Sequence, residues 1–238
     1  MPAVKLSDFI DERPLGRLQI RVIVLCTIVT LLDGFDAQSI GYVAPALTRS
    51  LGLQRSALGP IFGAGMAGMM FGALLFGPVA DRIGRKPTLM ICAVVFGVFS
   101  LVTATMTDVN DFIVMRFLTG LGLGGATPVA VTLTSEFCPR RLKMTLVIVM
   151  YCGFSIGSAL GGYVAAELIH RFTWQYVFYI GGTLPLALTP ILWMALPESV
   201  QFYLARRPAS KEIGRTIEKL APSSGSKAAR RPARSRRQ

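Results

Sequence analysis

The sequence has few charged residues for its length. Only 16% of its 238 residues are Asp, Glu, Lys or Arg, whereas soluble domains average about 25%. Hydrophobic residues make up 52% of the chain, and the mean hydropathy is +0.53. In a soluble domain the apolar residues would recur at helix or strand period, but here they run continuously. The scarcity of charge therefore argues against a soluble globular protein.

The residue types on which most enzymes and metal sites depend are also scarce. There is one histidine, His170, which we expect on an outer loop. The four cysteines show no CxxC or metal-ligand spacing; they are Cys26, Cys92, Cys138 and Cys152. No nucleophile is paired with a base, and there is no phosphate-binding loop. We therefore expect a protein that is not an enzyme and that uses no metal or other cofactor.

Long apolar runs are what the sequence has in abundance. A helix that spans a membrane needs roughly 20 apolar residues. Six runs reach that length, and they cover residues 22–46, 56–80, 87–106, 112–135, 144–166 and 172–196. Because the connections between them are short, we expect successive helices to be antiparallel neighbours. The sequence thus predicts an all-α membrane protein with a six-helix bundle over residues 22–196.

The net charge of +12 is distributed unevenly over the loops. Residues 1–21, residues 197–238 and the loops after the second and fourth runs together hold 21 Lys and Arg. The loops on the opposite side hold only three, Arg49, Arg55 and Arg171. The positive-inside rule therefore predicts that both termini lie in the cytoplasm. This pattern indicates membrane orientation, and we do not expect a nucleic-acid partner.

The segments outside the bundle have distinct compositions. Residues 1–21 are predicted to form a short cytoplasmic lead-in. Pro197 is expected to end the last span, because proline cannot continue a helix. Residues 197–220 are then predicted to include a cytoplasmic surface helix. Residues 221–238 are rich in Ala, Ser, Pro and Arg, and we expect this basic tail to be disordered because it cannot bury enough apolar surface.

Two carboxylates near the middle of the first run are the sharpest chemical feature. Asp33 and Asp36 are three residues apart, which places them on one face of a helix, and Gly34 between them leaves room for close approach. A charge at the membrane centre costs roughly 2.5–3.5 kcal/mol on insertion scales, so such residues usually serve function. Two buried carboxyls so close together should not both ionise easily. The alternative is a structural ion pair, for instance with Arg116.

One further charged residue lies in the fourth run and another directly follows it. Arg116 cannot lose its proton, so it must contact a carboxylate, a carbonyl oxygen or an anionic substrate. We expect a role in the transport path for Arg116, with snorkelling to the helix end as the alternative. Glu136 stands at the predicted cytoplasmic end of the same run. This position is compatible with a supporting role in transport and equally with a carboxylate at the membrane interface that has no specific function.

The loop between the second and third runs combines glycine, proline and charge. Its sequence is Gly-Pro-Val-Ala-Asp-Arg-Ile-Gly-Arg-Lys over residues 77–86. Gly84 permits a tight turn, and Asp81 can cap or pair across the helix ends. Anchoring by positive charge explains Arg82, Arg85 and Lys86 but not the whole arrangement. Glycines also recur at small spacings in the second, fourth and fifth runs, which predicts close helix packing.

This loop matches the loop signature of the major facilitator superfamily at every defining position. Residues 116–124 resemble the fourth-span pattern of that superfamily, and residues 197–199 resemble its usual close of the sixth span. The fifth span has Gly153, Gly157 and Gly161 but lacks the Gly-Pro of the antiporter pattern, which favours symport.

The first span carries a narrower resemblance. Residues 32–36, Leu-Asp-Gly-Phe-Asp, followed by Ala-Pro-Ala at 44–46, are similar to the first span of the aromatic acid/proton symporters. The resemblance, which covers about residues 15–207, implies that Asp33 and Asp36 serve proton coupling and substrate translocation. It also implies a gating role for the loop motif, namely Gly77, Asp81, Arg82, Gly84, Arg85 and Lys86.

The resemblance implies a twelve-span fold of two six-span halves around a central site, of which this chain supplies the N-terminal half. We therefore expect proton-coupled uptake of a small aromatic carboxylate, such as a hydroxybenzoate, across a bacterial inner membrane. The expected partners are the lipid bilayer and a C-terminal half or a second copy of the chain, and we expect the chain alone to insert without transporting. One alternative is a transporter of the same fold for another substrate, such as a sugar acid. Another is a truncated or scaffold protein of six spans that does not transport.

Overall fold

The computed structural model describes residues 15–52 and 54–199. This part of the chain holds six helices that are long and apolar enough to cross a membrane. They are α2 (Arg17–Leu51), α3 (Leu58–Ile83), α4 (Arg85–Thr103), α5 (Val109–Phe137), α6 (Lys143–Arg171) and α7 (Gln175–Ala195), and a short 3₁₀ turn, η1 (Arg55–Ala57), precedes α3. The prediction of six spanning helices is confirmed for the described residues.

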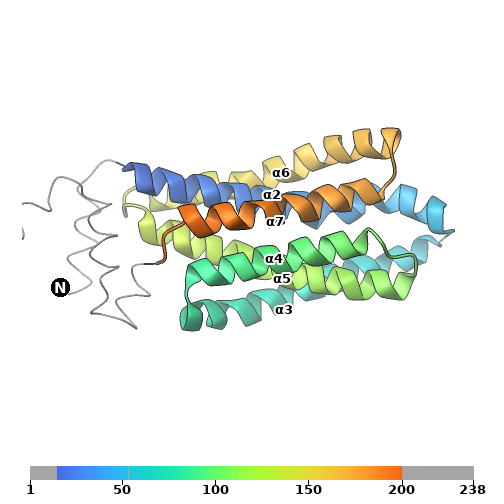
Figure 1. Cartoon of the computed structure of the whole chain (residues 1–238), viewed down its shortest axis with the longest axis horizontal. Helices are drawn as coiled ribbons and strands as arrows, with labels where there is room; N and C mark the ends of the chain where they lie inside the picture. The colour runs from blue at the N-terminus through green and yellow to red at the C-terminus, as the bar shows by residue number, and fades with distance from the viewer. Residues whose placement is uncertain (1–14, 53, 200–238) are drawn as a thin grey trace, which may run out of the picture.

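The six helices lie side by side in two groups of three (Figure 1). One group contains α2, α6 and α7, and the other contains α3, α4 and α5. The closest pairs are α3 with α5 and α2 with α6, and the two groups meet where α4 packs on α7 and α2 on α5. Neighbours in space are therefore mostly not neighbours in sequence, and α2 and α3 barely touch. The prediction that successive helices are neighbours is confirmed for α4 and α5, which pack closely, but not for α2 and α3, because short loops set direction but not partner.

Glycines allow the two closest pairs to approach backbone to backbone. A Cβ atom on Gly68 of α3 would collide with the carbonyl of Phe117 of α5. Likewise, a Cβ atom on Gly157 of α6 would collide with the carbonyl of Leu31 of α2. Small residues give helices in lipid their contact area, since no hydrophobic drive brings apolar helices together there. The predicted close packing is thus present at these two contacts.

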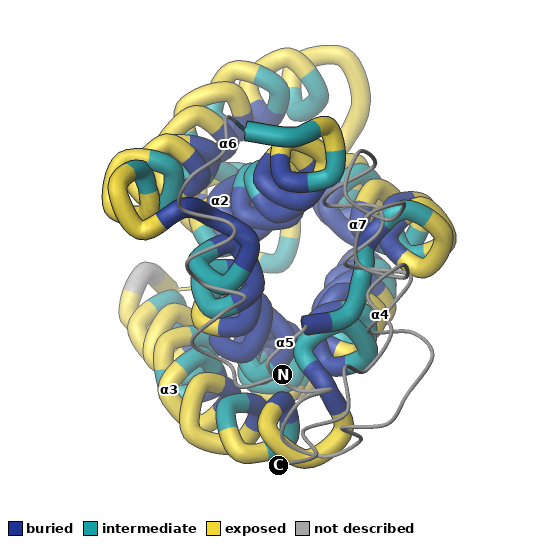
Figure 2. Tube along the Cα trace, turned by 90° about the vertical axis from the view of Figure 1, so that its left-hand side faces the viewer, coloured by how far each residue is buried: buried dark blue, intermediate teal, exposed yellow. Residues whose placement is uncertain are grey.

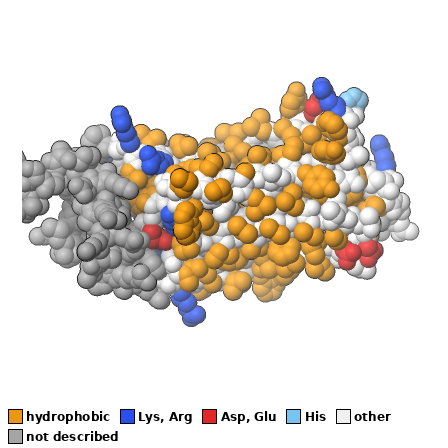
Figure 3. All heavy atoms as spheres, viewed as in Figure 1, with side chains coloured by type: hydrophobic (Ala, Val, Ile, Leu, Met, Phe, Trp, Pro, Cys, Tyr) orange, Lys and Arg blue, Asp and Glu red, His pale blue; other side chains and the backbone are white. Residues whose placement is uncertain are grey.

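The outer surface has the pattern expected in a bilayer. Viewed end-on, buried residues line the inner sides of the helices and exposed residues face outward, most of all on α3 and α6 (Figure 2). On the face drawn in Figure 3, apolar side chains cover the middle of the bundle and charged side chains gather at its two ends. The described chain enters and leaves the bundle at the same end, as an even number of spans requires (Figure 1).

Several predicted boundaries differ from the helices found. The first helix extends beyond residues 22–46 at both ends and takes in residues 17–21, which the sequence had suggested as lead-in. The third helix begins and ends earlier than the predicted 87–106, and the last is shorter than 172–196. His170 lies in the last turn of α6 and not in a loop.

The segments predicted at the chain ends are only partly described. Residues 196–199 follow α7 without regular structure, which agrees with a span that ends before Pro197. Most of the predicted lead-in (residues 1–14), most of the predicted surface-helix segment (residues 200–220) and the whole basic tail (residues 221–238) lie outside the described residues.

Candidate functional site

Asp33 and Asp36 lie in the middle of α2 and are buried inside the bundle. Their exposed fractions are 1% and 0%, so neither carboxyl faces the surroundings of the helix bundle. Gly34 between them meets the backbone of Phe154 in α6. Gly34 therefore allows α6 to approach α2 closely, on the side of α2 opposite to the two carboxyls. As a result, the two carboxyls point away from α6 toward α4 and α5.

Asp36 has a cation and a hydroxyl as partners. The Ser100 hydroxyl of α4 donates to Asp36 Oδ1 at 2.7 Å. Arg116 Nη1, on α5, lies 3.5 Å from Asp36 Oδ2, and both side chains are almost fully buried. Arg116 also donates to the Asp36 carbonyl at 3.3 Å and to the Ser39 hydroxyl at 3.4 Å. The ion pair that the sequence left open thus exists, and its carboxylate is Asp36.

Asp33 has a different environment, although it is only one helical turn away. The Thr127 hydroxyl of α5 donates to Asp33 Oδ2, whereas Oδ1 is buried and has no hydrogen-bond partner in the described part of the chain. Within residues 15–52 and 54–199 no cation pairs with Asp33. The two carboxyls are therefore chemically distinct: one belongs to an ion pair, and the other is held by a neutral hydroxyl.

Arg116 is not saturated by its contacts with Asp36 and Ser39. Its Nε atom is buried and has no hydrogen-bond partner among the described residues. Arg116 borders a small cavity of about 50 Å³ between α2, α3 and α5, whose other walls are mainly apolar, including Ile40, Phe62 and Met69. A guanidinium with a spare N–H beside apolar walls is suited to an anion that carries an apolar group.

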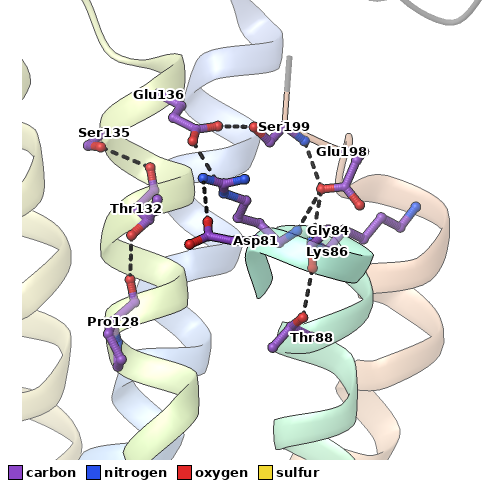
Figure 4. A network of polar contacts seen from close by, with 11 residues as sticks. Asp81, Gly84, Lys86, Thr88, Pro128, Thr132, Ser135, Glu136, Glu198 and Ser199 are labelled. Atoms are coloured by element: carbon purple, nitrogen blue, oxygen red, sulfur yellow. Dashed lines mark hydrogen bonds and ion pairs between the residues drawn. The ribbon is translucent and has the colours of Figure 1, made fainter. Parts of the chain in front are cut away.

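The predicted loop is in fact a tight junction at which only Gly84 separates α3 from α4, and residues on both sides of it take part in a polar network at one end of the bundle (Figure 4). Arg85 pairs with Asp81 at 3.1 Å and with Glu136 of α5 at 3.4 Å. The Ser199 hydroxyl, beyond α7, donates to the other oxygen of Glu136. These contacts tie together the ends of three helices, α3, α4 and α5, and the segment that follows α7. The predicted loop residues Asp81 and Arg85 and the predicted supporting residue Glu136 thus belong to one cluster.

Glu198, in the segment after α7, also belongs to this network. Its Oε1 atom accepts hydrogen bonds from the backbone N–H groups of Arg85 and Lys86 at 2.9 and 3.1 Å. These are the first two residues of α4, so Glu198 caps that helix and complements its dipole. Gly84 lies just before them with φ of +112°, a conformation that L side chains rarely adopt.

The remaining residues of the predicted loop motif lie outside the Arg85–Glu136 cluster. Lys86 donates to the Trp193 carbonyl of α7 at 2.6 Å and lies over the ring of the same residue. Arg82 is exposed at the end of α3. A Cβ atom on Gly77 would meet nothing within 4 Å, but Gly77 lines a second cavity together with Asp81 and Arg85.

Several polar residues of these two clusters had not been singled out from the sequence. Thr127, Ser39 and Ser100 are neutral hydroxyls in apolar runs, and such residues usually bond to their own helix backbone. Glu198 was noticed only as part of the segment that closes the last span. Its role depends on α4, more than a hundred positions earlier, so no local signal could have identified it.

Comparisons with known proteins identify the family of this chain. A family model described as Major Facilitator Superfamily matches residues 26–236. The 4-hydroxybenzoate transporter PcaK of Pseudomonas putida is 46% identical over 92% of this chain and 49% of its own length. The gallate transporter of the same species is 42% identical over 91% of this chain and 48% of its own length.

Solved structures show the same fold. A partially occluded inward-open structure of the xylose transporter XylE from E. coli superposes with a TM-score of 0.76 at 20% identity, over 86% of this chain and 54% of that one. This chain spans about half the length of the curated relatives it matches. Its six helices therefore correspond to one half of such a transporter, and the chain belongs to the major facilitator superfamily.

Proposed function

We propose that this chain forms the N-terminal half of a proton-coupled importer of small aromatic carboxylates, such as a hydroxybenzoate. The observation that carries the proposal is its similarity to transporters named for such compounds. Besides those for 4-hydroxybenzoate and gallate, the 3-(3-hydroxy-phenyl)propionate transporter of Escherichia coli is 43% identical over 75% of this chain. Every one of these named substrates has a phenolic ring and a carboxylate, whereas the likeness to xylose transporters is one of fold alone.

The charged groups buried between α2, α4 and α5 support this proposal, because they could bind a carboxylate and a proton. Arg116 is the group that we propose for the substrate carboxylate, because it borders a mainly apolar cavity and its Nε atom has no hydrogen-bond partner among the described residues. Asp36 keeps the guanidinium oriented, and Asp33 is the proposed proton carrier, because no cation in the described residues compensates its charge. One proton and one carboxylate together add no net charge to the buried site, which lowers the cost of moving both across a membrane.

The network at the α3–α4 loop is the proposed gate. Asp81, Arg85 and Glu136 join helix ends that would have to separate if the bundle changed its tilt. Arg82 and Lys86 add positive charge at the same end, and Gly77 and Gly84 provide space and a turn. We propose that this end lies in the cytoplasm, because the segments on this side hold 21 Lys and Arg and the loops on the opposite side hold only three.

The exposed faces of α3 and α6 are the proposed contact with a second six-helix unit. They carry large apolar side chains such as Met66, Leu74, Ile156 and Tyr163. Transporters of this fold work by rocking two bundles around a site at their interface. We therefore propose a C-terminal half as the partner, with a second copy of this chain as the alternative occupant.

Co-expression tests the function directly. The chain is expressed alone and together with the C-terminal half of a 4-hydroxybenzoate transporter, and uptake of radiolabelled 4-hydroxybenzoate is measured with and without a proton gradient. We expect insertion in both cases but gradient-dependent uptake only in the pair. Asp33→Asn and Asp36→Asn should each abolish that uptake while insertion is retained.

Other outcomes would change the proposal. Accumulation by the chain alone would point to a working homodimer. Uptake of a sugar acid without uptake of any aromatic acid would replace the substrate class. Gradient-dependent uptake by both Asn variants would exclude the roles proposed for the two carboxylates.

A further inference from the structure

The contact between Asp33 and Thr127 is the starting point, because it links the centres of two helices. Asp33 belongs to α2 and Thr127 to α5, 94 residues later, and the threonine hydroxyl donates to Asp33 Oδ2. Most other threonine hydroxyls of the bundle donate to the carbonyl four residues earlier in their own helix. Examples are Thr27, Thr30, Thr119 and Thr132. The Thr127 hydroxyl thus differs from these, because it donates to a carboxyl group on another helix.

The surroundings of Asp33 leave one of its oxygens free for a proton. The titratable groups that face Asp33 are Cys92 of α4, a buried thiol, and Asp36 of its own helix. Arg116, the buried cation of the described bundle, is engaged with Asp36. Asp33 Oδ1 is buried and has no hydrogen-bond partner in the described chain. Because Oδ2 already accepts from Thr127, Oδ1 is the oxygen to which a proton would add.

Space for water lies close to this pair. A cavity of about 140 Å³ between α3 and α5 is lined by Asp81 and Arg85 at the loop end and by Pro128 and Thr132 along α5. Pro128 directly follows Thr127, and Thr127 itself is only half-buried. A cavity of this volume, with Asp81, Arg85 and Thr132 among its lining residues, has room for several water molecules. Thr127 itself does not line this cavity, but it directly precedes a residue of the cavity wall.

We propose that Thr127 is a positioning residue for a proton site on Asp33. Its hydroxyl holds Oδ2 and so presents Oδ1 to the incoming proton, which comes from water and returns to water without any bond between heavy atoms being made or broken. The role of this site in transport rests on the proposed function. The existence of the site does not, because it can be observed in the chain without a substrate.

Infrared spectroscopy of the 238-residue chain in lipid vesicles tests the proposal. Spectra are recorded over a pH series, and the carboxyl C=O band of protonated Asp33 is identified as the pH-dependent band that Asp33→Asn removes. In Thr127→Val, which keeps the side-chain shape but lacks the hydroxyl, this band should move to higher frequency. The pH at which it appears should move by roughly one to two units, as expected for a lost hydrogen bond to a charged group.

Two variants make the result specific. Thr127→Ser keeps the hydroxyl and should restore both the frequency and the pH of the wild-type band. Thr119→Val is the matched control, since it removes a hydroxyl from the same helix that donates only to the Met115 carbonyl, and its band should be that of the wild type. If Thr127→Val fails to insert, the comparison of Thr127→Ser and Thr127→Ala replaces it.

The proposal is overturned if no pH-dependent carboxyl band is lost in Asp33→Asn. It is also overturned if the loss of the Thr127 hydroxyl leaves the band unchanged, or if Thr119→Val changes it equally. Failure of the proposed function would instead appear as absent aromatic-acid uptake in the co-expressed pair, with the infrared result intact.

Discussion

At the scale of single residues, the spacing of two carboxyls on one helix face does not decide their chemistry. Asp33 and Asp36 are one turn apart, yet Asp36 contacts Ser100 and Arg116 while Asp33 contacts Thr127. A buried ion pair is compensated only as long as both members remain. A carboxyl held by a hydroxyl can take up a proton without leaving a buried partner charge uncompensated. The two aspartates should therefore respond differently to the same substitution.

We predict that Asp36→Asn destabilises the bundle far more than Asp33→Asn does. Asp36→Asn leaves Arg116 buried without a counter-charge, at a cost of about 3–5 kcal/mol. Asp33→Asn keeps an oxygen acceptor for Thr127, so we expect a change of no more than about 1 kcal/mol. Thermal unfolding in detergent, followed by circular dichroism, measures the difference.

The double variant Asp36→Asn with Arg116→Gln provides the control, because it removes both charges and should recover part of the lost stability. An Asp33→Asn variant as unstable as Asp36→Asn would contradict the different roles described for the two carboxyls, and a double variant no more stable than Asp36→Asn would show that the unpaired Arg116 is not the cause of the loss.

At the scale of helices, glycine positions determine which helices pack closely. Gly68 of α3 lies directly against the backbone of Phe117 in α5, whereas a Cβ atom added to Gly63 of the same helix would have no neighbour within 4 Å. Two glycines in one helix thus differ in a property that their sequence spacing does not reveal. The contact between α3 and α5 is among the most extensive in the bundle, so its disruption should affect the whole structure.

We predict that Gly68→Ala destabilises the bundle and that Gly63→Ala does not. The added methyl group at position 68 would force α3 and α5 apart, and overpacking of this kind costs about 1–3 kcal/mol. At position 63 the methyl group meets open space, and alanine favours the helix over glycine by up to about 1 kcal/mol. The two variants are compared by thermal unfolding in the same detergent. Equal stability of the two would contradict the packing described for α3 and α5.

At the scale of the whole molecule, charge and apolar surface divide the bundle into three zones. Apolar side chains surround the middle, and charges lie at the ends (Figure 3). The α3–α4 and α5–α6 connections lie at the end where the described chain enters and leaves the bundle (Figure 1). Asp108 and His170 are exposed at the opposite end. The proposed orientation places this opposite end outside the cell.

Cysteine labelling in intact cells tests that orientation. We predict that Asp108→Cys and His170→Cys react with a membrane-impermeant maleimide before lysis, whereas Arg140→Cys, at the other end, reacts only after lysis. Cys152 is exposed and should be replaced first, while Cys26, Cys92 and Cys138 are buried. Burial also raises the pKa of Cys138, just beyond α5, to about 11, so its thiol remains protonated and unreactive at neutral pH. The reverse labelling pattern would place the termini outside.

The sequence alone determined the class of the protein and the number of its spans. The length of an apolar run is a local property, so six runs predicted six helices, with errors only at their ends. The loop motif and the Asp33–Asp36 segment were equally visible, since each lies within ten residues. From these the superfamily could be predicted, and the comparisons confirmed it.

Only the tertiary structure decided which helices pack together and which partner each buried charge has. The preference of α3 for α5 and of α2 for α6 depends on contacts between segments far apart in the chain. The rotation of each helix about its axis decides that Arg116 pairs with Asp36 and not with Asp33. It also decides that Thr127 contacts Asp33. The physical reason is that a helix forms its backbone hydrogen bonds within itself, so its own sequence decides whether it forms. Its position and rotation in the bundle depend on packing and charge compensation between segments far apart in the chain.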